Sequence, residues 1–270
     1  MKSSFQTFYK YRYLLYEIVR KNIKLQYRDS ALGVLWTFIQ PLLTTIVLVV
    51  VFGNLLGKDS SKVLNYPIYL LCGRLLFEFY SQSTKRAMRS ITNSASVIKK
   101  VYVPKYIYPL ANVISNFITF LISLIVLVCF IAYFKISGVN PPNITPYALL
   151  AFVPIIVLFI LCTGVGLILS TLSVFFKDIE YLYDVFCLLL FYMTPIVYNL
   201  DQLKITNTAI LTVLKANPLY SIIEMFRSCV LFGRMFSIHH LVYSLAFSLL
   251  CVAVGALLFR KKQDKFILHI

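Results

Sequence analysis

Two opposite charges, Arg74 and Glu78, stand in an apolar run that covers residues 63–84. They are four residues apart, a spacing that places both side chains on one helix face and lets them partly neutralise each other. In a helix that crosses a membrane, a charge at such depth faces the protein interior or a wet cavity. Two interpretations remain open: contact with an anionic or hydroxyl-rich ligand, or a structural ion pair near a membrane interface.

Asp178, Glu180 and Asp184 form the only close group of acidic residues. A membrane enzyme such as a glycosyltransferase would need such a group as metal ligands or as a base, so this class is kept as an alternative. The nearest imitation of a phosphate-binding loop, residues 53–59 (GNLLGKD), has one residue too few between its glycines and ends in Asp. H-E-x-x-H and G-x-S-x-G are also absent from the sequence. We therefore expect no ATPase site, no bound metal or cofactor and no enzyme activity in this chain.

The composition indicates that these groups are held by helices in a membrane. The chain has 270 residues, 60% hydrophobic and 13% charged, with a mean hydropathy of +0.82. This apolar surplus excludes a soluble enzyme, because soluble domains are about half apolar. The net charge of +16 does not indicate a nucleic-acid partner, since the cations cluster at the edges of apolar runs as topology signals. The six cysteines, scattered in apolar stretches without a C-x-x-C pair, are interpreted as packing residues.

Six segments are expected to cross the membrane, each a helix of about 20 residues. They are residues 31–57, 63–84, 106–134, 147–176, 181–200 and 235–259. The fifth is shorter, with Asp184 near its start and Pro195 near its end. No repeat or low-complexity linker divides the chain, so we expect an all-α, polytopic membrane protein with one transmembrane domain over residues 1–270.

Lys and Arg are distributed unevenly over the connecting segments. Eighteen lie on the side that carries both termini and seven on the other, with Arg74 inside a span. Because the cytoplasmic side carries the excess, both termini are expected in the cytoplasm. Residues 1–30 are then a cytoplasmic interfacial segment, 31–260 the six-span region and 261–270 a cytoplasmic tail. The polar, basic residues before the first span do not resemble a cleavable signal.

Two amphipathic segments are expected on the cytoplasmic side. Residues 5–28 carry cations on one helix face, and the other face carries Tyr11, Leu14, Leu15, Ile18 and Leu25. This helix is therefore expected on the inner membrane surface. It serves either as an anchor alone or also as a docking site for a partner. Residues 88–104 place Ile91, Ala95, Ile98 and Tyr102 at helical spacing. They form either a short helix that fits a groove on another protein or a solvated connector.

A third segment, residues 217–233, is expected on the opposite side. Asn217 and Pro218 predict a helix start, with Asn as the cap and Pro at the first helical position. Apolar residues follow at helical spacing until Gly233, whereas Glu224 and Arg227 argue against a crossing by so short a helix. A re-entrant or interfacial position is therefore expected, which is tolerated where a segment lines a cavity or packs on protein.

Three aromatic residues, Trp36, Tyr192 and Tyr198, lie within the expected spans or at their ends. Their rings could present faces to the C–H bonds of a sugar. Aromatic side chains on apolar helices also serve as ordinary packing residues. Both interpretations remain open.

Four groups of strings occur in a characteristic order. They are residues 27–36 (YRDSALGVLW) with Gln40 and Pro41; 97–105 (VIKKVYVPK) with Pro109; 174–179 (VFFKDI) with 194–196 (TPI); and 217–219 (NPL) with Phe226 and Arg227. Together with six spans, they resemble the type-2 ABC transporter permeases that export polysaccharides and teichoic acids. The resemblance covers nearly the whole chain.

The resemblance implies a homodimer paired with two separate ATP-binding subunits, which hold the ATP and Mg²⁺. It implies export of a lipid-linked glycan of O-antigen, capsule or teichoic acid type across the cytoplasmic (inner) membrane. Three alternatives are a glycan-modifying membrane enzyme, an ABC exporter of another lipid or a drug, and a secondary transporter. The last class usually has internal repeats and more intramembrane ionisable residues than this sequence.

The resemblance also implies roles for individual residues. Contacts that couple the permease to the ATP-binding subunit fall on Ile91, Asn93, Ala95, Ile98, Lys99, Lys100, Lys177 and Asp178. Lys177 departs from the Arg that is common in the family, which removes bidentate pairing but keeps the charge. The substrate conduit is assigned Arg28, Trp36, Arg74, Glu78, Tyr192 and Tyr198, with Arg28 attracting the lipid's pyrophosphate. An outer gate is assigned Asn217, Pro218, Phe226 and Arg227.

Overall fold

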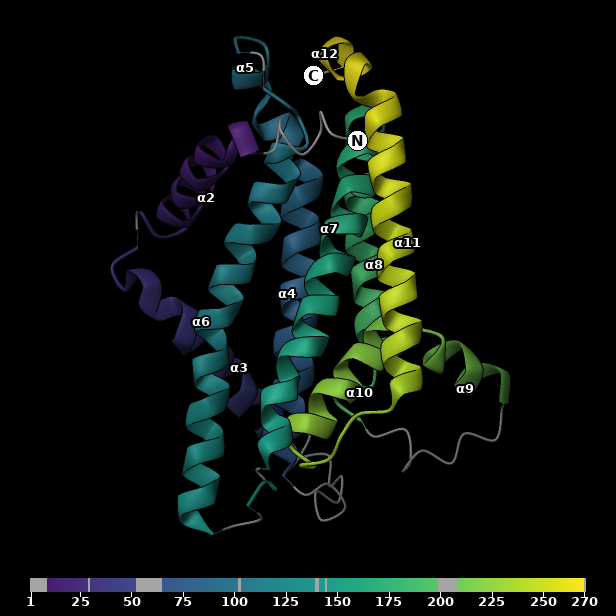
Figure 1. Cartoon of the computed structure of the whole chain (residues 1–270). Helices are drawn as coiled ribbons and strands as arrows, with labels where there is room; N and C mark the ends of the chain where they lie inside the picture. Colours follow the sequence, from purple (N-terminus) through teal and green to yellow (C-terminus); the bar gives the residue numbers. More distant parts are fainter. Residues whose placement is uncertain are drawn as a thin grey trace.

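The computed structural model describes residues 9–28, 30–51, 65–101, 103–138, 141–143, 145–198 and 208–269. Every regular element in these ranges is a helix, and the longest helices run side by side along one axis (Figure 1). The all-α expectation is therefore confirmed for the part of the chain that the structure describes.

Four long helices form the body of the bundle. They are α4 (Tyr66–Asn93), α6 (Ile107–Ser137), α7 (Phe152–Phe175, entered through the 3-10 helix η4, Pro146–Ala151) and α11 (Ile238–Lys262). α7 is central, because α4, α6 and α11 all pack against it. Among the described residues, three helices are long and apolar enough to cross a membrane: Ile107–Ser137, Pro146–Phe175 and Ile238–Lys265. They coincide with the third, fourth and last expected spans.

α4 contains the second expected span but is more polar than the other long helices. It continues past the expected end at residue 84 through basic and hydroxyl residues as far as Asn93. Most of its side chains are buried between neighbouring helices. Protein packing, and not lipid, therefore surrounds this helix, which explains how it accommodates Arg74 and Glu78.

Two facing glycines let α7 and α11 approach closely. A Cβ added to Gly164 of α7 would lie 2.5 Å from the backbone nitrogen of Val252, and one added to Gly255 of α11 would lie 2.7 Å from the Gly164 carbonyl oxygen. Small residues at such positions are the usual means of bringing membrane helices into backbone contact. The tight α7–α11 pair thus depends on the absence of side chains at these two positions.

Replacing Gly164 by Leu is expected to separate α7 from α11 and to destabilise the fold by about 3 kcal/mol, since overpacking at backbone contact cannot be relieved by rotamer changes. Thermal unfolding of the detergent-solubilised chain measures this effect. Ala246→Leu adds the same side chain at an exposed position of α11 and is the matched control. Equal unfolding temperatures for the two variants would contradict the close-packing argument.

The N-terminal helices lie on one side of the bundle. α2 (Arg12–Tyr27) packs against α6, and α3 (Trp36–Val49) follows the 3-10 helix η1 (Gly33–Leu35) and packs against α4 and α6. Figure 1 shows α2 slanting away from the long helices. Val19 is its one buried residue, whereas Leu25, expected on the apolar face, is 48% exposed. The first expected span extends to residue 57, and its last part, residues 52–57, lies outside the described residues.

The fifth expected span is shorter than predicted. α8 (Ile179–Met193) stops at Met193, and the chain turns at Thr194–Pro195. After residues 199–207, which lie outside the described residues, α9 (Thr208–Lys215) and α10 (Pro218–Val230) follow. Thr194 leaves the helical region with φ −90° and ψ 127°, as expected for a residue before proline. Proline therefore sets the end of this helix.

The two ends of the bundle carry different elements. Figure 1 shows the four-residue α5 (Ala95–Ile98) and α12 (Phe266–His269) at one end, and α10 toward the other. A small apolar cluster closes the first end, formed by Ile91, Ile98, Tyr108, Val174, Phe259 and Phe266. Residues 88–104, expected as a single short helix, are divided instead: α4 continues to Asn93, and α5 follows a break at Ser94.

Candidate functional site

A polar pocket lies between α2, α3, α4 and α6. It encloses about 530 Å³ of space, including the part that is open to the outside. Three aromatic residues, Trp36, Phe79 and Phe120, form part of its wall. Its polar lining consists of Gln26, Tyr27, Thr37, Gln40, Glu78, Gln82, Asn116, Thr119 and Ser123. On α4 and α6 these positions are three or four residues apart, so each helix presents its polar residues on one face.

Glu78 brings an incompletely neutralised carboxylate to this pocket. The Gln82 side-chain amide donates to Glu78 Oε1 at 3.0 Å. Arg74 Nε is 3.8 Å from Glu78 Oε2, which gives electrostatic attraction but is too long for a hydrogen bond. Glu78 Oε2 is shielded from solvent and has no hydrogen-bond partner among the described residues. This oxygen therefore has unused acceptor capacity at the pocket.

Asn116 supplies a second unused acceptor. Its side chain is 4% exposed, and its Nδ2 donates to the carbonyl oxygen of Asn112 at 2.9 Å. Its Oδ1 is buried and has no hydrogen-bond partner in the part of the chain that the structure describes. An unsatisfied buried polar atom costs about 1–3 kcal/mol, so two of them at one pocket are best explained by a ligand with O–H or N–H groups.

A chain of polar contacts fixes one wall of the pocket. Arg86 Nη1 of α4 donates to Gln26 Oε1 at 2.8 Å, and Gln26 Nε2 donates to Tyr27 Oη at 3.1 Å. The Tyr27 and Thr37 hydroxyl oxygens are 3.1 Å apart. These contacts connect α4 with the end of α2 and the start of α3. They place Trp36, next to Thr37 in the sequence, at the pocket.

The structure unites only part of the predicted conduit. Trp36 and Glu78 line the pocket, and Arg74 reaches it through its ion pair with Glu78. Tyr192 and Tyr198 form a separate pair, because the Tyr198 hydroxyl donates to the Tyr192 carbonyl oxygen at 2.7 Å. Neither tyrosine is among the residues that line the pocket, and Arg28 is an exposed residue at the end of α2 that does not line it either.

Asn116 was not predicted as a site residue. The available signal was an amide within the uncharged run of residues 106–134. An isolated Asn in a span does not by itself indicate a pocket, because its side chain can bond to its own helix. Only the positions of α3 and α4 reveal that the second half of the amide is unused.

The residues predicted as an outer gate surround the start and end of α10. The Asn217 side chain caps the helix by accepting from the Leu219 backbone N–H at 3.0 Å, and its Nδ2 donates to Thr194 Oγ1 at 2.9 Å. Pro218 occupies the first turn, and Phe226 is buried. The helix therefore joins the turn that follows α8.

Arg227 is fully buried and holds three segments together. Its Nε and Nη2 donate to the Tyr69 carbonyl oxygen at 3.2 and 3.1 Å, Nη1 donates to that of Pro195 at 2.8 Å, and Nη2 also donates to that of Ile196 at 3.1 Å. The guanidinium carbon is 3.5 Å from the centroid of the Tyr69 ring. Among the described residues, no carboxylate forms an ion pair with it. Carbonyl dipoles and an aromatic face therefore stabilise this cation.

The residues predicted to couple the chain to a partner lie around one end of the bundle. Asn93, Lys99 and Lys100 are exposed, and Ala95 is half-buried. Ile91 and Ile98 are buried in the apolar cluster of this end, so they position α5 and are not available for an outside contact. Lys177 and Asp178 are exposed in the turn between α7 and α8.

Two of the three grouped acidic residues pair with bases on α4. Asp184 Oδ1 lies 2.7 Å from Lys85 Nζ, and Glu180 Oε2 accepts a hydrogen bond from Arg89 Nε at 2.9 Å. These partly exposed ion pairs connect α8 to α4 near the end that carries α5. Glu180 and Asp184 thus have partners that account for their presence, and the described residues hold no group of three or more residues suited to a metal ion.

Comparison with protein families gives one match over most of the chain. Residues 13–231 match the ABC-2 type transporter family. This segment includes the pocket, α5, the α7–α8 turn and α10.

Individual proteins are similar over nearly their whole length. An O-antigen export system permease protein, RfbA, of Klebsiella pneumoniae is 29% identical over 94% of this chain and 93% of its own. RfbA of Myxococcus xanthus is 26% identical over 96% of this chain and 95% of its own. The polysialic acid transport protein KpsM of Escherichia coli is 22% identical over 90% of this chain and 91% of its own.

Proposed function

Because the chain belongs to the ABC-2 type transporter family, we propose that it is the permease subunit of an ATP-driven polysaccharide exporter. The substrate is a lipid-linked glycan of O-antigen, capsule or teichoic acid type, moved across the cytoplasmic membrane. The observation that carries this proposal is the alignment with permeases named for O-antigen export over 94% and 96% of the chain.

The proposal includes six membrane passes, by α3, α4, α6, α7, α8 and α11, with both termini in the cytoplasm. α3 and α8 have 14 and 15 residues, whereas a helix that spans the membrane needs about 20. The non-helical residues that complete these two passes therefore need protein contacts that shield their backbone polar groups from lipid. The basic end with α5 is the cytoplasmic one. α2 lies at the inner membrane surface, and α9 and α10 form the re-entrant outer gate.

A homodimer is part of the proposal, and α8 supplies an argument for it. Only Tyr183 and Cys187 of this helix are buried within the chain. A row of large apolar side chains is exposed, made up of Tyr181, Leu182, Val185, Phe186, Leu188, Leu189 and Tyr192. A second copy packed on this face would cover a helix that is too short to span the bilayer alone. Tyr192 and Tyr198 would then stand at the interface between copies, in the conduit.

The polar pocket is proposed to contact the glycan. Sugar hydroxyls can donate to Glu78 Oε2 and Asn116 Oδ1, while Trp36 offers a ring face to sugar C–H bonds. Arg74 Nε lies 3.8 Å from Glu78 Oε2, so it attracts the carboxylate without using this oxygen as a hydrogen-bond acceptor. Arg28, exposed at the end of α2, is proposed to attract the pyrophosphate of the lipid carrier.

Energy is proposed to come from two ATP-binding subunits that carry ATP and Mg²⁺ and dock on the basic end. The surface available to them consists of Asn93, Ala95, Lys99 and Lys100 beside α5 and of Lys177 and Asp178 in the α7–α8 turn. Ile91 and Ile98 anchor α5 on α4, α7 and α11, so a force on α5 is transmitted to the bundle. This surface is distinct from the polar pocket.

Reversing two charges of this surface, with Lys99→Glu and Lys100→Glu together, is expected to reduce co-purification of the ATP-binding subunit about tenfold. The reason is that charge complementarity across such a contact controls both association and partner choice. Quantitative pull-down of the two subunits from solubilised membranes measures the change. Lys261→Glu with Lys265→Glu reverses two exposed charges at the same end and is the control. Equal retention by both double variants would contradict the assigned docking surface.

Reconstitution tests the function as a whole. The chain in proteoliposomes is expected to hydrolyse no ATP alone, and to export a labelled lipid-linked oligosaccharide when its ATP-binding partner and ATP are added. Robust ATP hydrolysis by the chain alone would overturn the proposal. Glycan modification that persists without any ATPase and is lost on substitution of Asp178, Glu180 and Asp184 would identify a membrane enzyme instead. ATP-driven movement of other lipids but not of the glycan would leave an exporter of another substrate.

A further inference from the structure

A second cavity lies along α7, between residues of α6 and α11. It is a groove with α7 as its floor and with α6 and α11 as its walls, and it holds about 930 Å³ of space, including its open side. The floor contributes Thr163 and Leu167, and the walls contribute Tyr106, Leu110, Ala256, Phe259, Arg260 and Gln263. None of these residues belongs to the pocket assigned to the glycan.

The groove is amphiphilic along its length. Arg260, Gln263 and Tyr106 supply its polar groups at the basic end of the bundle, near the start of α6 and the end of α11. Leu110, Leu167 and Ala256 make its deeper part apolar. All three helices that form it are long and apolar enough to cross a membrane. With the membrane passes and the cytoplasmic basic end proposed above, the open side of the groove faces the hydrocarbon region and its polar end lies at the level of the inner-leaflet headgroups.

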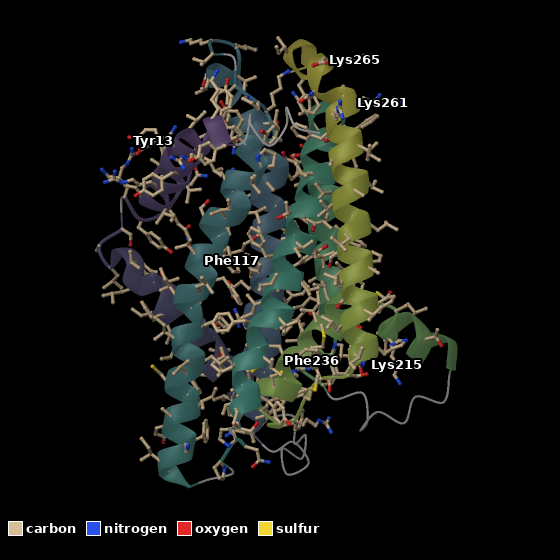
Figure 2. All side chains as sticks on the ribbon, viewed as in Figure 1. Tyr13, Phe117, Lys215, Phe236, Lys261 and Lys265 are labelled. Atoms are coloured by element: carbon tan, nitrogen blue, oxygen red, sulfur yellow. The ribbon has the colours of Figure 1, made fainter. Side chains whose placement is uncertain are left out.

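Positive charge surrounds the polar end. Figure 2 shows Lys261 and Lys265 at this end of α11. Lys105 Nζ donates to the Gln263 carbonyl oxygen, which ties the start of α6 to the end of α11. Partial burial lowers the pKa of Lys105, against the opposing effect of Asp264. Arg260 itself is exposed and forms no ion pair with a described residue, so its guanidinium is available for an anion.

Two residues near the C-terminal end, Lys262 and Phe266, lie outside the lining of this groove. Phe266 of α12 is fully buried against Phe175 and Phe259, with ring centroids 5.9 and 5.2 Å apart. Lys262 Nζ lies 5.6 Å from the centroid of the Phe175 ring, and Lys262 is not among the residues that line the groove. Phe266 therefore packs into the apolar cluster at the end of the bundle and not into the groove.

We infer that this groove binds one acidic phospholipid of the inner leaflet, with its phosphate at Arg260 and Gln263 and an acyl chain along Leu110, Leu167 and Ala256. Basic pockets between membrane helices on the cytoplasmic side are suited to acidic headgroups. A guanidinium can form two hydrogen bonds to the oxygens of one phosphate. In a zwitterionic lipid, the ammonium group of the headgroup already neutralises the phosphate charge, so an acidic lipid is attracted more strongly. The bound lipid would fill the space between α6 and α11 and so support α7. The inference does not depend on which substrate is exported.

Quenching by brominated lipids tests the site directly. Trp36 is the only tryptophan, so a Trp36→Phe background with Leu110→Trp places one fluorophore in the groove. The full chain is reconstituted in mixtures of phosphatidylcholine and phosphatidylglycerol in which one of the two is brominated. The lipid association constant at this groove reporter is expected to favour phosphatidylglycerol about fivefold, the effect of one interfacial cation. Ile125→Trp reports on an exposed position of α6 outside the groove and is expected to show no preference.

Substitutions at the basic end identify the headgroup contact. Arg260→Gln is expected to abolish the preference at the groove reporter, and Arg260→Lys to retain part of it. Lys261→Gln removes a neighbouring exposed charge outside the groove lining and is expected to leave the preference unchanged. A preference that survives Arg260→Gln, or that is equal at the Ile125 reporter, would overturn the inference. Displacement by equimolar polyprenyl pyrophosphate without any phosphatidylglycerol preference would also overturn it, because the groove would then hold the transported lipid.

Discussion

Replacing Arg227 by Leu is expected to destabilise the protein by about 3–5 kcal/mol, since the carbonyl oxygens of Tyr69, Pro195 and Ile196 would lose their buried donor. The loss would separate α10 from α4 and from the turn after α8 at the same time. Thermal unfolding of the solubilised protein measures the effect, expected as a decrease of about 10 °C or more in the midpoint.

The carbonyl oxygens of Tyr69, Pro195 and Ile196 form a carbonyl cage around Arg227. Three further variants distinguish the contribution of this cage from the contribution of the positive charge alone. Arg227→Lys keeps the charge but not the planar fork that reaches all three carbonyls, so it is expected to recover only part of the stability. Gly73→Ala places a Cβ 2.6 Å from Arg227 Nη2 and is expected to displace the guanidinium, with a smaller loss. Arg234→Leu removes an exposed cation from the same region and is the control. A midpoint for Arg227→Leu equal to that of Arg234→Leu would refute the carbonyl cage.

The long helices were predictable because each is a continuous local pattern. Residues 106–134 contain no charge and exceed the length of a span, and α6 occupies Ile107–Ser137. The start of α10 was equally local, because the Asn217 cap and Pro218 lie side by side in the sequence. In both examples the information that fixes the element lies within the element, so no knowledge of its neighbours is needed.

The Arg227 cage was not predictable because its partners are distant in sequence. Its donors bond to carbonyl groups 158, 32 and 31 residues away, and every residue type offers a carbonyl. The sequence showed a cation on a short apolar helix, which argued for a re-entrant or interfacial position of that helix. The end of α8 was indicated by Pro195, but the contact that holds the turn after it was not, because Arg227 reaches the Pro195 carbonyl oxygen from 32 residues away.

The polar pocket was predictable in part. The charges of Arg74 and Glu78 were conspicuous in an apolar run, and the structure pairs them on one helix face. The partner wall on α6 was not conspicuous, because Asn116 and Asn112 look alike in the sequence. Helix rotation decides between them: Asn116 lines the pocket with a free acceptor, and Asn112 does not line it.

Replacing Asn116 by Leu is therefore expected to reduce glycan export more than tenfold while making the protein more stable by about 1 kcal/mol. Leu removes an acceptor that has no partner within the described chain, so the folded state no longer carries a buried unsatisfied oxygen. The bound sugar loses a hydrogen-bond partner in a desolvated site, and apolar bulk occupies its space. Strain kept at a functional site in this way is a known cause of opposite effects on stability and activity. Transport in proteoliposomes and thermal unfolding of the same preparation measure both effects.

Asn112→Leu is the matched control for this prediction. Asn112 is one turn earlier on α6, and its Nδ2 donates to the Tyr108 carbonyl oxygen at 3.0 Å, as Asn116 Nδ2 does to that of Asn112. Both substitutions remove a contact within α6, and Asn112→Leu also removes the hydrogen bond that Asn112 Oδ1 accepts from Asn22 Nδ2 of α2 at 3.5 Å, but only Asn116 faces the pocket. Export by Asn112→Leu is expected to remain within about twofold of the unmodified chain, because no pocket acceptor is lost. If Asn116→Leu destabilises the protein and both variants lose export equally, Asn116 has a packing role and the pocket does not bind the glycan.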